Sequence, residues 1–567
     1  MPDARKLVLC LLLTAAILPF WIGIGDSTLW DANEAFYAET PRVMIETGDY
    51  VSPSFNANPR FNKPPLTYWV VAISYKIFGV SEWSERLPIV LGAMGLIAAA
   101  FVIGQIVWGT EAGLWAAIVM ATLPRFLMHS RRTSIDVFLT LFMGLTLMFF
   151  VLAELRPERR RSWLCLMYAS VGLGFMTKGP VAVVLPGAAI FIYLLIEKRL
   201  KDIGKMMVPA GIAIFLAIVV PWYLLVYRKH GGSYIVSFIL NENISRYTDE
   251  GWGPRRQFFY LQTLLGDLFP WSLLVIAGLV CVLFRKQIGQ AVFGGGGRTD
   301  EGPPVINDGP DVEFSIARLM GIWIVVIVGF YSLSRNQQDQ YMMPTYLAAA
   351  VLSGALIAAF IDKRADWTRW LFVATGGLFA AIGGSFVYIV SRTSNLDLAG
   401  TDLVGYILLA GGLATLVFAL IGKRELAVYS KIWAIVGVMF VFVILTLPDF
   451  ERYKPVKALS EVIAQNAGPE ARIGYYRYTA PTMVFYLHRP VLEYFQEKEM
   501  IALFASGGPA YMIMTEADYK AIRPKLATPT RVIASRPLLR IRLNELFREP
   551  KNPSVVLVTN DTYHALL

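Results

Sequence analysis

Charged residues are scarce in this chain of 567 residues, at 17% of the total against about 25% in soluble globular proteins. Apolar residues are correspondingly abundant, at 56%. This composition argues against a soluble enzyme and against a disordered chain, because neither class carries so much apolar sequence. Many apolar runs reach the roughly 20 residues that a helix needs to cross a bilayer. The sequence therefore predicts a polytopic membrane protein.

Cysteine and histidine are rare as well. The three cysteines, Cys10, Cys165 and Cys281, each lie inside an apolar run, and this odd number supports no disulfide framework. The four histidines lack the spacing of metal ligands, so a histidine-based metal site is not indicated. Walker A and dinucleotide-binding sequences are also missing, which leaves nucleotide-driven chemistry without motif support. We predict no certain cofactor, and participation of a divalent cation stays open.

Basic residues exceed acidic ones, with 52 Lys and Arg against 42 Asp and Glu and a net charge of +10. In a soluble protein this excess would suggest a nucleic-acid partner. In a membrane protein it is better explained by basic loops that stay on the cytoplasmic side. We therefore expect membrane lipids, and no nucleic acid, as partners.

The basic loops also fix the expected topology. If the apolar run at 66–80 crossed the membrane, the basic clusters at 156–161 and 198–205 would face outward, against the positive-inside bias. That run is short and follows Pro64-Pro65, so we predict a helix on the outer surface instead. About thirteen spans then remain. The odd count places the C-terminus in the periplasm, for a chain in the inner membrane of a bacterium.

Two domains are predicted. Residues 1–447 form an all-α polytopic membrane domain, whose first periplasmic loop at 26–86 carries juxtamembrane helices. Residues 448–567 form a periplasmic α/β domain, because runs of strand length there alternate with helix-like segments. The expected strands are Arg472–Tyr476, Val491–Tyr494, Tyr511–Met514, Arg531–Ala534 and Ser554–Val558.

Polar residues gather in the outer loops. On a helix, Asp31 and Glu34 share a face, as do Glu34 and Tyr37, and carboxylates beside a tyrosine could serve as a general base for a hydroxyl acceptor. The alternative is a solvated amphipathic helix with acidic residues near its N-terminus. Both interpretations stay open on these residues alone.

The second outer loop carries Arg131 and Arg132 on the side where basic residues are disfavoured, and Asp136 follows at the start of the next span. Two arginines could hold a phosphate, or could reach toward lipid headgroups. Asp136 could instead compensate the helix dipole. Lys178, at a tight outer turn, could reach a lipid phosphate or the membrane surface.

A set of short motifs over most of residues 1–350 resembles those of a known enzyme family. The motifs are Asn33-Glu34-x-x-Tyr37-Ala38-Glu39, Lys63-Pro64-Pro65-Leu66, Asp136, Thr177-Lys178-Gly179-Pro180 and Asn336-x-x-Asp339-x-Tyr341. They are similar to those of bacterial GT-C type glycosyltransferases that use polyprenyl-phosphate sugars. This is the group of the lipid A aminoarabinose transferase, related to the protein O-mannosyltransferases.

The resemblance implies an activity and a fold. Such enzymes take a sugar from a polyprenyl phosphate, such as undecaprenyl phosphate, in the outer leaflet. They pass it to a hydroxyl or phosphate of a lipid A-like lipid, a glycan or a protein outside the cytoplasm. The resemblance also implies thirteen spans and a C-terminal periplasmic α/β domain, in agreement with the loop charges.

The resemblance also implies the catalytic residues. The acidic pair of the family falls on Asn33 and Glu34, and its second-loop aspartate falls on Asp136. Because Asn33 stands where relatives carry aspartate, we expect the base to be Glu34 or the nearby Asp31, helped by Asp136. Asn33 and Tyr37 are expected to bind substrate.

A second group of residues is expected to bind the donor phosphate. Lys63 matches a lysine that contacts this phosphate in relatives, and Arg131, Arg132 and Lys178 would add further cations. Tyr341 would donate a hydrogen bond. Attack of the acceptor hydroxyl in a single displacement would invert the anomeric carbon. Preorganised cations at the departing phosphate would lower the barrier by several kcal/mol, about what one oxyanion-hole donor contributes.

Two other functions suit a polytopic chain. A transporter or flippase would carry ionisable residues in the middle of its spans. The apolar runs here are nearly devoid of them, which favours chemistry at the surface. A polymerase or ligase of lipid-linked glycans is closer chemically and stays an alternative.

Overall fold

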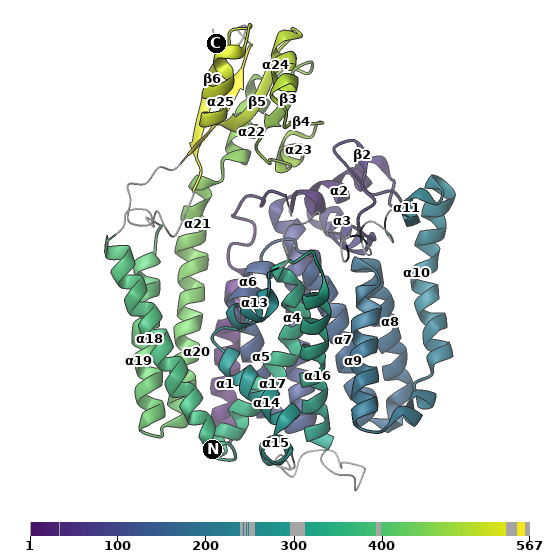
Figure 1. The fold of residues 1–567 in the computed structure, drawn as a ribbon, viewed down its shortest axis with the longest axis vertical. Helices are drawn as coiled ribbons and strands as arrows, with labels where there is room; N and C mark the ends of the chain where they lie inside the picture. Colours follow the sequence, from purple (N-terminus) through teal and green to yellow (C-terminus); the bar gives the residue numbers. More distant parts are fainter. Residues whose placement is uncertain are drawn as a thin grey trace.

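The computed structural model describes residues 2–32, 34–236, 256–294, 312–392, 398–539 and 553–561, with residues 238, 242, 245 and 248. Long helices stand side by side in a bundle, and a small domain with a β-sheet stands at one end of it (Figure 1). This architecture confirms the predicted all-α polytopic domain with a C-terminal α/β domain.

Nine helices among the described residues are long and apolar enough to cross a membrane. They are α1 (Pro2–Trp21), α4 (Glu82–Trp108), α7 (Ile135–Leu155), α10 (Val208–His230), α16 (Val312–Leu333), α17 (Tyr346–Ile361) with the 3₁₀ turn before it, α18 (Arg369–Arg392), α19 (Thr401–Leu420) and α20 (Arg424–Val441). Each of these helices corresponds to a long apolar run of the sequence. A helix is the favoured form of such a run in a bilayer, because it pairs the backbone N–H and C=O groups within the segment.

Two helix pairs that bend at a short break are further candidates, each either a broken span or a re-entrant loop. Helices α5 (Thr110–Ala121) and α6 (Pro124–Ser130) meet at 67°, and helices α13 (Phe259–Asp267) and α14 (Ser272–Phe284) meet at 117°. Two more helices lie in the same bundle, α8 (Arg160–Lys178) against α7 and α9 (Val181–Ile196) against α16. Among the described residues, the candidate spans therefore number nine, or eleven if each bent pair is one span, and the count of about thirteen stays a prediction.

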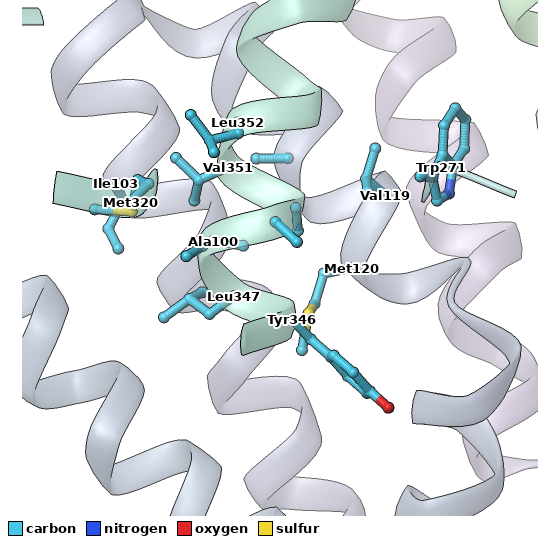
Figure 2. Close-up of a cluster of buried hydrophobic side chains, with 14 of the residues drawn as sticks. Ala100, Ile103, Val119, Met120, Trp271, Met320, Tyr346, Leu347, Val351 and Leu352 are labelled. Carbon is cyan, nitrogen blue, oxygen red and sulfur yellow. The ribbon is translucent and has the colours of Figure 1, made fainter. Parts of the chain in front are cut away.

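Helix α17 is the centre of the bundle, and every residue from Tyr346 to Ile361 is buried. Figure 2 shows its side chains packed among those of its neighbours. The labelled contacts include Leu347, Val351 and Leu352 of α17, Ala100 and Ile103 of α4, Val119 and Met120 of α5, and Met320 of α16. Gly354 faces the backbone of Ala116, and small residues at such a contact let two helices approach closely. This packing holds the start of α17, which borders the candidate site.

The first outer loop folds into short elements at the same end as the C-terminal domain (Figure 1). Helix α2 (Glu34–Thr47) is followed by a hairpin of β1 (Ser54–Phe55) and β2 (Asn58–Pro59), then by α3 (Leu66–Phe78). A helix of 13 residues is about 20 Å long, too short to cross the roughly 30 Å apolar layer. This agrees with the surface position expected for residues 66–80.

The C-terminal domain is a five-stranded mixed sheet in the order β4-β3-β5-β7-β6, flanked by helices. Its strands are β3 (Arg472–Tyr476), β4 (Leu492–Tyr494), β5 (Ala510–Thr515), β6 (Arg531–Pro537) and β7 (Ser554–Thr559), and its helices are α22 (Pro455–Asn466), α23 (Thr482–Leu487), α24 (Glu497–Ala505) and α25 (Glu516–Ile522). All five predicted strands are present. The helical segment from α20 continues to Tyr453, so the boundary between residues 447 and 448 stays a prediction.

A buried ion pair joins the first loop to the bundle. Glu34 and Arg86 are both fully buried, and the carboxylate accepts two hydrogen bonds from the guanidinium, at 2.9 and 2.8 Å. The same carboxylate accepts the backbone N–H groups of Trp30 and Thr133, at 2.8 and 2.7 Å. The remaining Arg86 donors reach the residue 24–28 segment, including the Ser27 carbonyl at 2.7 Å. Three chain segments are therefore fixed by one pair of side chains.

Removing one partner of this pair should destabilise the protein strongly. We expect Arg86→Gln to lower the free energy of unfolding by about 3–5 kcal/mol, because a buried carboxylate loses its countercharge. The measurement is the midpoint of thermal unfolding of the purified protein in detergent. Lys205→Gln is the matched control, since it breaks the exposed pair with Asp202 and should change stability by less than about 1 kcal/mol. Equal midpoints for the two variants would contradict this role.

Candidate functional site

A cavity of about 400 Å³ lies where the outer loops meet the ends of the helices. Its walls come from α2, from residues 60–63, from residues 132–136, from the end of α8 and from residues 338–341. Six residues selected from the sequence line it: Tyr37, Lys63, Arg132, Asp136, Lys178 and Tyr341. The fold thus brings together residues that lie up to 304 positions apart, between Tyr37 and Tyr341.

Asp136 and Lys178 form an ion pair in this cavity. Asp136 is in the first turn of α7 and Lys178 is the last residue of α8, so two packed helix ends place the charges opposite each other. The Lys178 ammonium also lies 4.6 Å from the centre of the Tyr341 ring. Contact with an aromatic face favours a cation. Lys178 therefore lies on the cavity wall between Asp136 and Tyr341, in a position where a phosphate could reach it.

Lys63 and Glu242 form a second ion pair on the cavity wall, with Nζ and Oε2 2.7 Å apart. Both side chains are 13% exposed. Arg132 adds another cation, and its guanidinium lies 5.9 Å from the centre of the Trp30 ring. Cations thus line the cavity on more than one side.

Three residues expected at the site are not brought to the cavity. The first, Arg131, donates to the carbonyl oxygens of Pro19, Ile22 and Gly23, at 2.5, 2.6 and 3.1 Å. These carbonyls belong to the end of α1 and the turn after it, where a cation satisfies acceptors that the helix leaves unpaired. The structure therefore gives Arg131 a contact with α1 in place of the expected phosphate contact.

The second is Glu34, which lies behind the cavity wall with both oxygens occupied by the donors named above. Burial alone would raise the pKa of this carboxyl. The Arg86 guanidinium and the N–H groups of Trp30 and Thr133 nonetheless hold its pKa below the usual value. A carboxylate that is ionised, enclosed and fully bonded is poorly placed to take a proton from a substrate.

The third is Asp31, whose carboxylate accepts hydrogen bonds from the backbone N–H and the hydroxyl of Thr482 in α23. Burial raises the pKa of Asp31 to about 6, although the Thr482 hydrogen bonds oppose the shift. Asp31 thus connects the first loop to the C-terminal domain. Asn33, which was also expected at the site, lies outside the described residues.

Tyr37 lines the cavity from α2 and stacks on Tyr68, with ring centres 5.4 Å apart. Burial raises the pKa of the Tyr37 phenol well above its usual value, and the neighbouring Tyr68 adds to the shift. The hydroxyl therefore stays protonated at neutral pH. It can donate a hydrogen bond to a bound substrate.

Four further ionisable residues line the cavity and were not selected as site residues from the sequence: Arg60, His129, Glu242 and Asp339. Asp339 forms an ion pair with Arg125, which follows Pro124 at the break between α5 and α6. The sequence could have pointed to this ion pair, because an arginine stands beside a proline at a break between two apolar helices. Glu242 gave no such signal, because nothing local connects it with Lys63, 179 positions earlier.

Within the described residues, no group of three or more His, Cys, Asp or Glu side chains is arranged to hold a metal ion. The cavity carboxylates of Asp136, Glu242 and Asp339 each lie against a lysine or arginine. A cation would have to compete with these side chains for the oxygens. The described cavity side chains therefore fit an anion better than a divalent metal ion.

The sequence of the chain is similar to those of known proteins. Residues 62–224 match the family described as dolichyl-phosphate-mannose-protein mannosyltransferase. An uncharacterized protein of Aquifex aeolicus (strain VF5) is 26% identical over 384 residues, which cover 68% of this chain and 70% of that protein.

A second relative has a described activity. The undecaprenyl phosphate-alpha-4-amino-4-deoxy-L-arabinose arabinosyl transferase of Pseudomonas aeruginosa (strain UCBPP-PA14) is 27% identical over 359 residues. The match covers 62% of this chain and 60% of the relative. The chain thus spans less than two thirds of that enzyme's length.

Two solved structures share the fold. ArnT from Cupriavidus metallidurans, bound to undecaprenyl phosphate, aligns with a TM-score of 0.76 and 21% identity over 98% of both chains. The archaeal oligosaccharyltransferase AglB from Archaeoglobus fulgidus aligns with a TM-score of 0.52 and 12% identity, over 90% of this chain and 69% of that one. The chain is thus similar in sequence to the family described as dolichyl-phosphate-mannose-protein mannosyltransferase and to aminoarabinose transferases, and it shares the fold of the two solved structures.

Proposed function

We propose that this glycosyltransferase transfers a sugar from a polyprenyl-phosphate donor to an acceptor hydroxyl outside the cytoplasm. The observation that carries the proposal is the cavity that Lys63, Arg132 and Lys178 line together with Asp136, whose carboxylate pairs with Lys178. Cations suit a phosphate, and a carboxylate beside them suits an acid–base step. The relatives that use undecaprenyl phosphate support this donor class.

In the proposed reaction, Asp136 accepts the proton of the acceptor hydroxyl as its oxygen attacks the anomeric carbon. The bond between that carbon and the phosphate oxygen breaks, and the carbon is inverted by the single displacement. The donor phosphodiester carries one negative charge, and the departing phosphate monoester carries up to two. Lys178 and Lys63 stabilise the charge that develops, which preorganised cations do most effectively in a site shielded from water.

Glu34 has a positioning role in this proposal. Its hydrogen bond to the Thr133 N–H fixes the chain three residues before Asp136. Asp31 acts at the contact with the C-terminal domain. The acid–base step therefore falls to Asp136, which the sequence had placed in a supporting role.

The orientation of the chain follows from its basic loops. Arg5 pairs with Glu111 and Glu425, so the starts of α1, α5 and α20 lie at one end of the bundle. The basic pair Lys423-Arg424 is at that end, opposite the C-terminal domain (Figure 1). By the positive-inside bias we assign the cavity and the C-terminal domain to the periplasm.

Asp136→Asn should reduce sugar transfer by at least a hundredfold, because the amide cannot accept the hydroxyl proton. The measurement is release of polyprenyl phosphate from donor-loaded proteoliposomes. Asp31→Asn is the matched control, since it makes the same chemical change outside the cavity and should retain most of the rate. Equal loss in both variants, or no loss in Asp136→Asn, would remove Asp136 from the acid–base role.

Lys63→Ala should raise the KM for the donor about tenfold, which corresponds to about 1.4 kcal/mol of binding. The control is Lys229→Ala, because Lys229 pairs with Asp49 at the same end of the molecule and does not line the described cavity. The KM from initial rates at varied donor concentration distinguishes the two. An unchanged KM in Lys63→Ala would contradict the phosphate contact.

Chelation should leave the rate unchanged, because each described cavity carboxylate already lies against a basic side chain. Initial rates are measured after dialysis against EDTA and again after Mg²⁺ or Zn²⁺ is added back. Loss of activity that either metal restores would show that a divalent cation takes part in the reaction.

The function itself is tested on the cell envelope. Mass spectrometry of lipids and glycans, with and without the protein, should show one class of molecule that gains a single sugar. One polyprenyl phosphate should be released per sugar transferred. Transfer of a preassembled chain would favour a polymerase or ligase, and movement of an unmodified lipid would favour a transporter.

A further inference from the structure

A second cavity, here called the interdomain cavity, lies between the first outer loop and the C-terminal domain. Its volume is about 520 Å³. One side is formed by Phe36, by the β1–β2 hairpin and by the residues after it, and the other side by residues 490–493 before and in β4. Phe36, Arg60 and Asn62 line both this cavity and the one that holds Asp136. The two cavities therefore share a wall.

The interdomain cavity combines amide side chains with flat aromatic rings. Asn58 and Asn62 contribute amides, and Glu493 contributes a carboxylate that also accepts a hydrogen bond from the Tyr475 hydroxyl. Phe36 and Phe55 lie edge to face, with ring centres 4.7 Å apart. Amides donate and accept hydrogen bonds, as sugar hydroxyls do, and an aromatic ring can cover the apolar C–H face of a sugar ring. This lining fits a saccharide.

A peptide is the main competitor, because β4 is an edge strand of the sheet. An extended peptide would bind there by pairing with the backbone of the strand edge. The Asn56 side chain already occupies the backbone just before β4. Its Nδ2 donates to the Val491 carbonyl oxygen and its Oδ1 accepts from the Val491 N–H, both at 2.8 Å. This contact shortens the edge that a peptide could use and favours the saccharide.

The hairpin is shaped for this contact. Asn56 and Ala57 at its tip both have positive φ, of 50° and 62°, which is the conformation of a tight two-residue hairpin turn. Alanine adopts this region only at a cost of about 1–2 kcal/mol. The contact between Asn56 and Val491 helps to hold the strained tip against the C-terminal domain.

We infer that the interdomain cavity binds the saccharide part of the acceptor and presents one of its hydroxyls at the wall shared with the donor cavity. This inference rests on the proposed function. The new bond forms between that hydroxyl oxygen and the anomeric carbon of the donor sugar. The bond to phosphate breaks, Asp136 takes the proton, and polyprenyl phosphate leaves.

Binding of saccharide probes tests the inference on the full chain in lipid nanodiscs, by saturation-transfer NMR. One probe is the oligosaccharide fraction that mild acid releases from envelope glycolipids, and the other is soluble fragments of envelope polysaccharide. We expect one of them to bind, and its identity reports the source of the acceptor. Tryptic peptides from envelope proteins are the competing probe and should not bind.

Glu493→Gln and Asn58→Ala should each weaken saccharide binding at least fivefold. Glu499→Gln is the matched control, since this carboxylate is also exposed on the C-terminal domain and does not line the interdomain cavity. Both test variants should keep the thermal midpoint. They should also keep the slow hydrolysis of the donor, in which water takes the place of the acceptor and polyprenyl phosphate is released.

The outcomes separate this inference from the proposed function. Binding that is equal in Glu493→Gln, Asn58→Ala and Glu499→Gln would overturn the inference, as would binding of peptides and not of saccharides. Absence of any polyprenyl phosphate release by the unaltered protein would instead overturn the proposed function.

Discussion

The end of the bundle that carries the cavity depends on one buried ion pair, between Glu34 and Arg86. Two charges withdrawn from water are costly, and the cost is offset only where every donor and acceptor finds a partner. Glu34 and Arg86 meet this condition through bonds to each other, to the backbone of residues 24–30 and to the backbone of Thr133. The first loop, the start of α4 and the chain before α7 are therefore fixed relative to one another. The position of Asp136 follows from this arrangement.

Two ion pairs also lie on the wall of the cavity. Asp136 lies against Lys178 and Glu242 against Lys63, so each buried charge has a partner before substrate arrives. An arriving phosphate can share these lysines with the carboxylates. The electrostatic attraction is strong because the pairs are partly withdrawn from water.

The C-terminal domain is attached to the catalytic end through the first loop. Thr482 donates to Asp31, Val491 bonds to Asn56, and Lys457 pairs with Glu82 at 2.8 Å. Because the same loop also supplies Tyr37 and Lys63 to the cavity, one segment serves both domains. The contacts of the C-terminal domain and the lining of the cavity therefore depend on the same loop.

Local sequence was sufficient for the architecture. The length of an apolar run determines whether a helix can cross a bilayer, so a bundle of long apolar helices could be predicted, and the short helix over residues 66–78 agrees with the surface position expected there. Alternating short runs likewise predicted the five strands. The order of motifs also predicted that Lys63, Asp136, Lys178 and Tyr341 belong to one site, and they do line one cavity.

Tertiary structure alone decided what each polar side chain contacts. Glu34 and Arg131 looked like site residues, but their partners lie 52 and 99 positions away for Glu34 and 108 to 112 for Arg131. Asp31 finds its partner 451 positions away. Glu242 and Arg60 reach the cavity with no local pattern to announce them. The sequence thus determined which segments cross the membrane, because that depends on the hydrophobicity of neighbouring residues. Only the fold determined which carboxylate is enclosed and which faces the cavity, because burial and hydrogen-bond partners are set by residues distant along the chain.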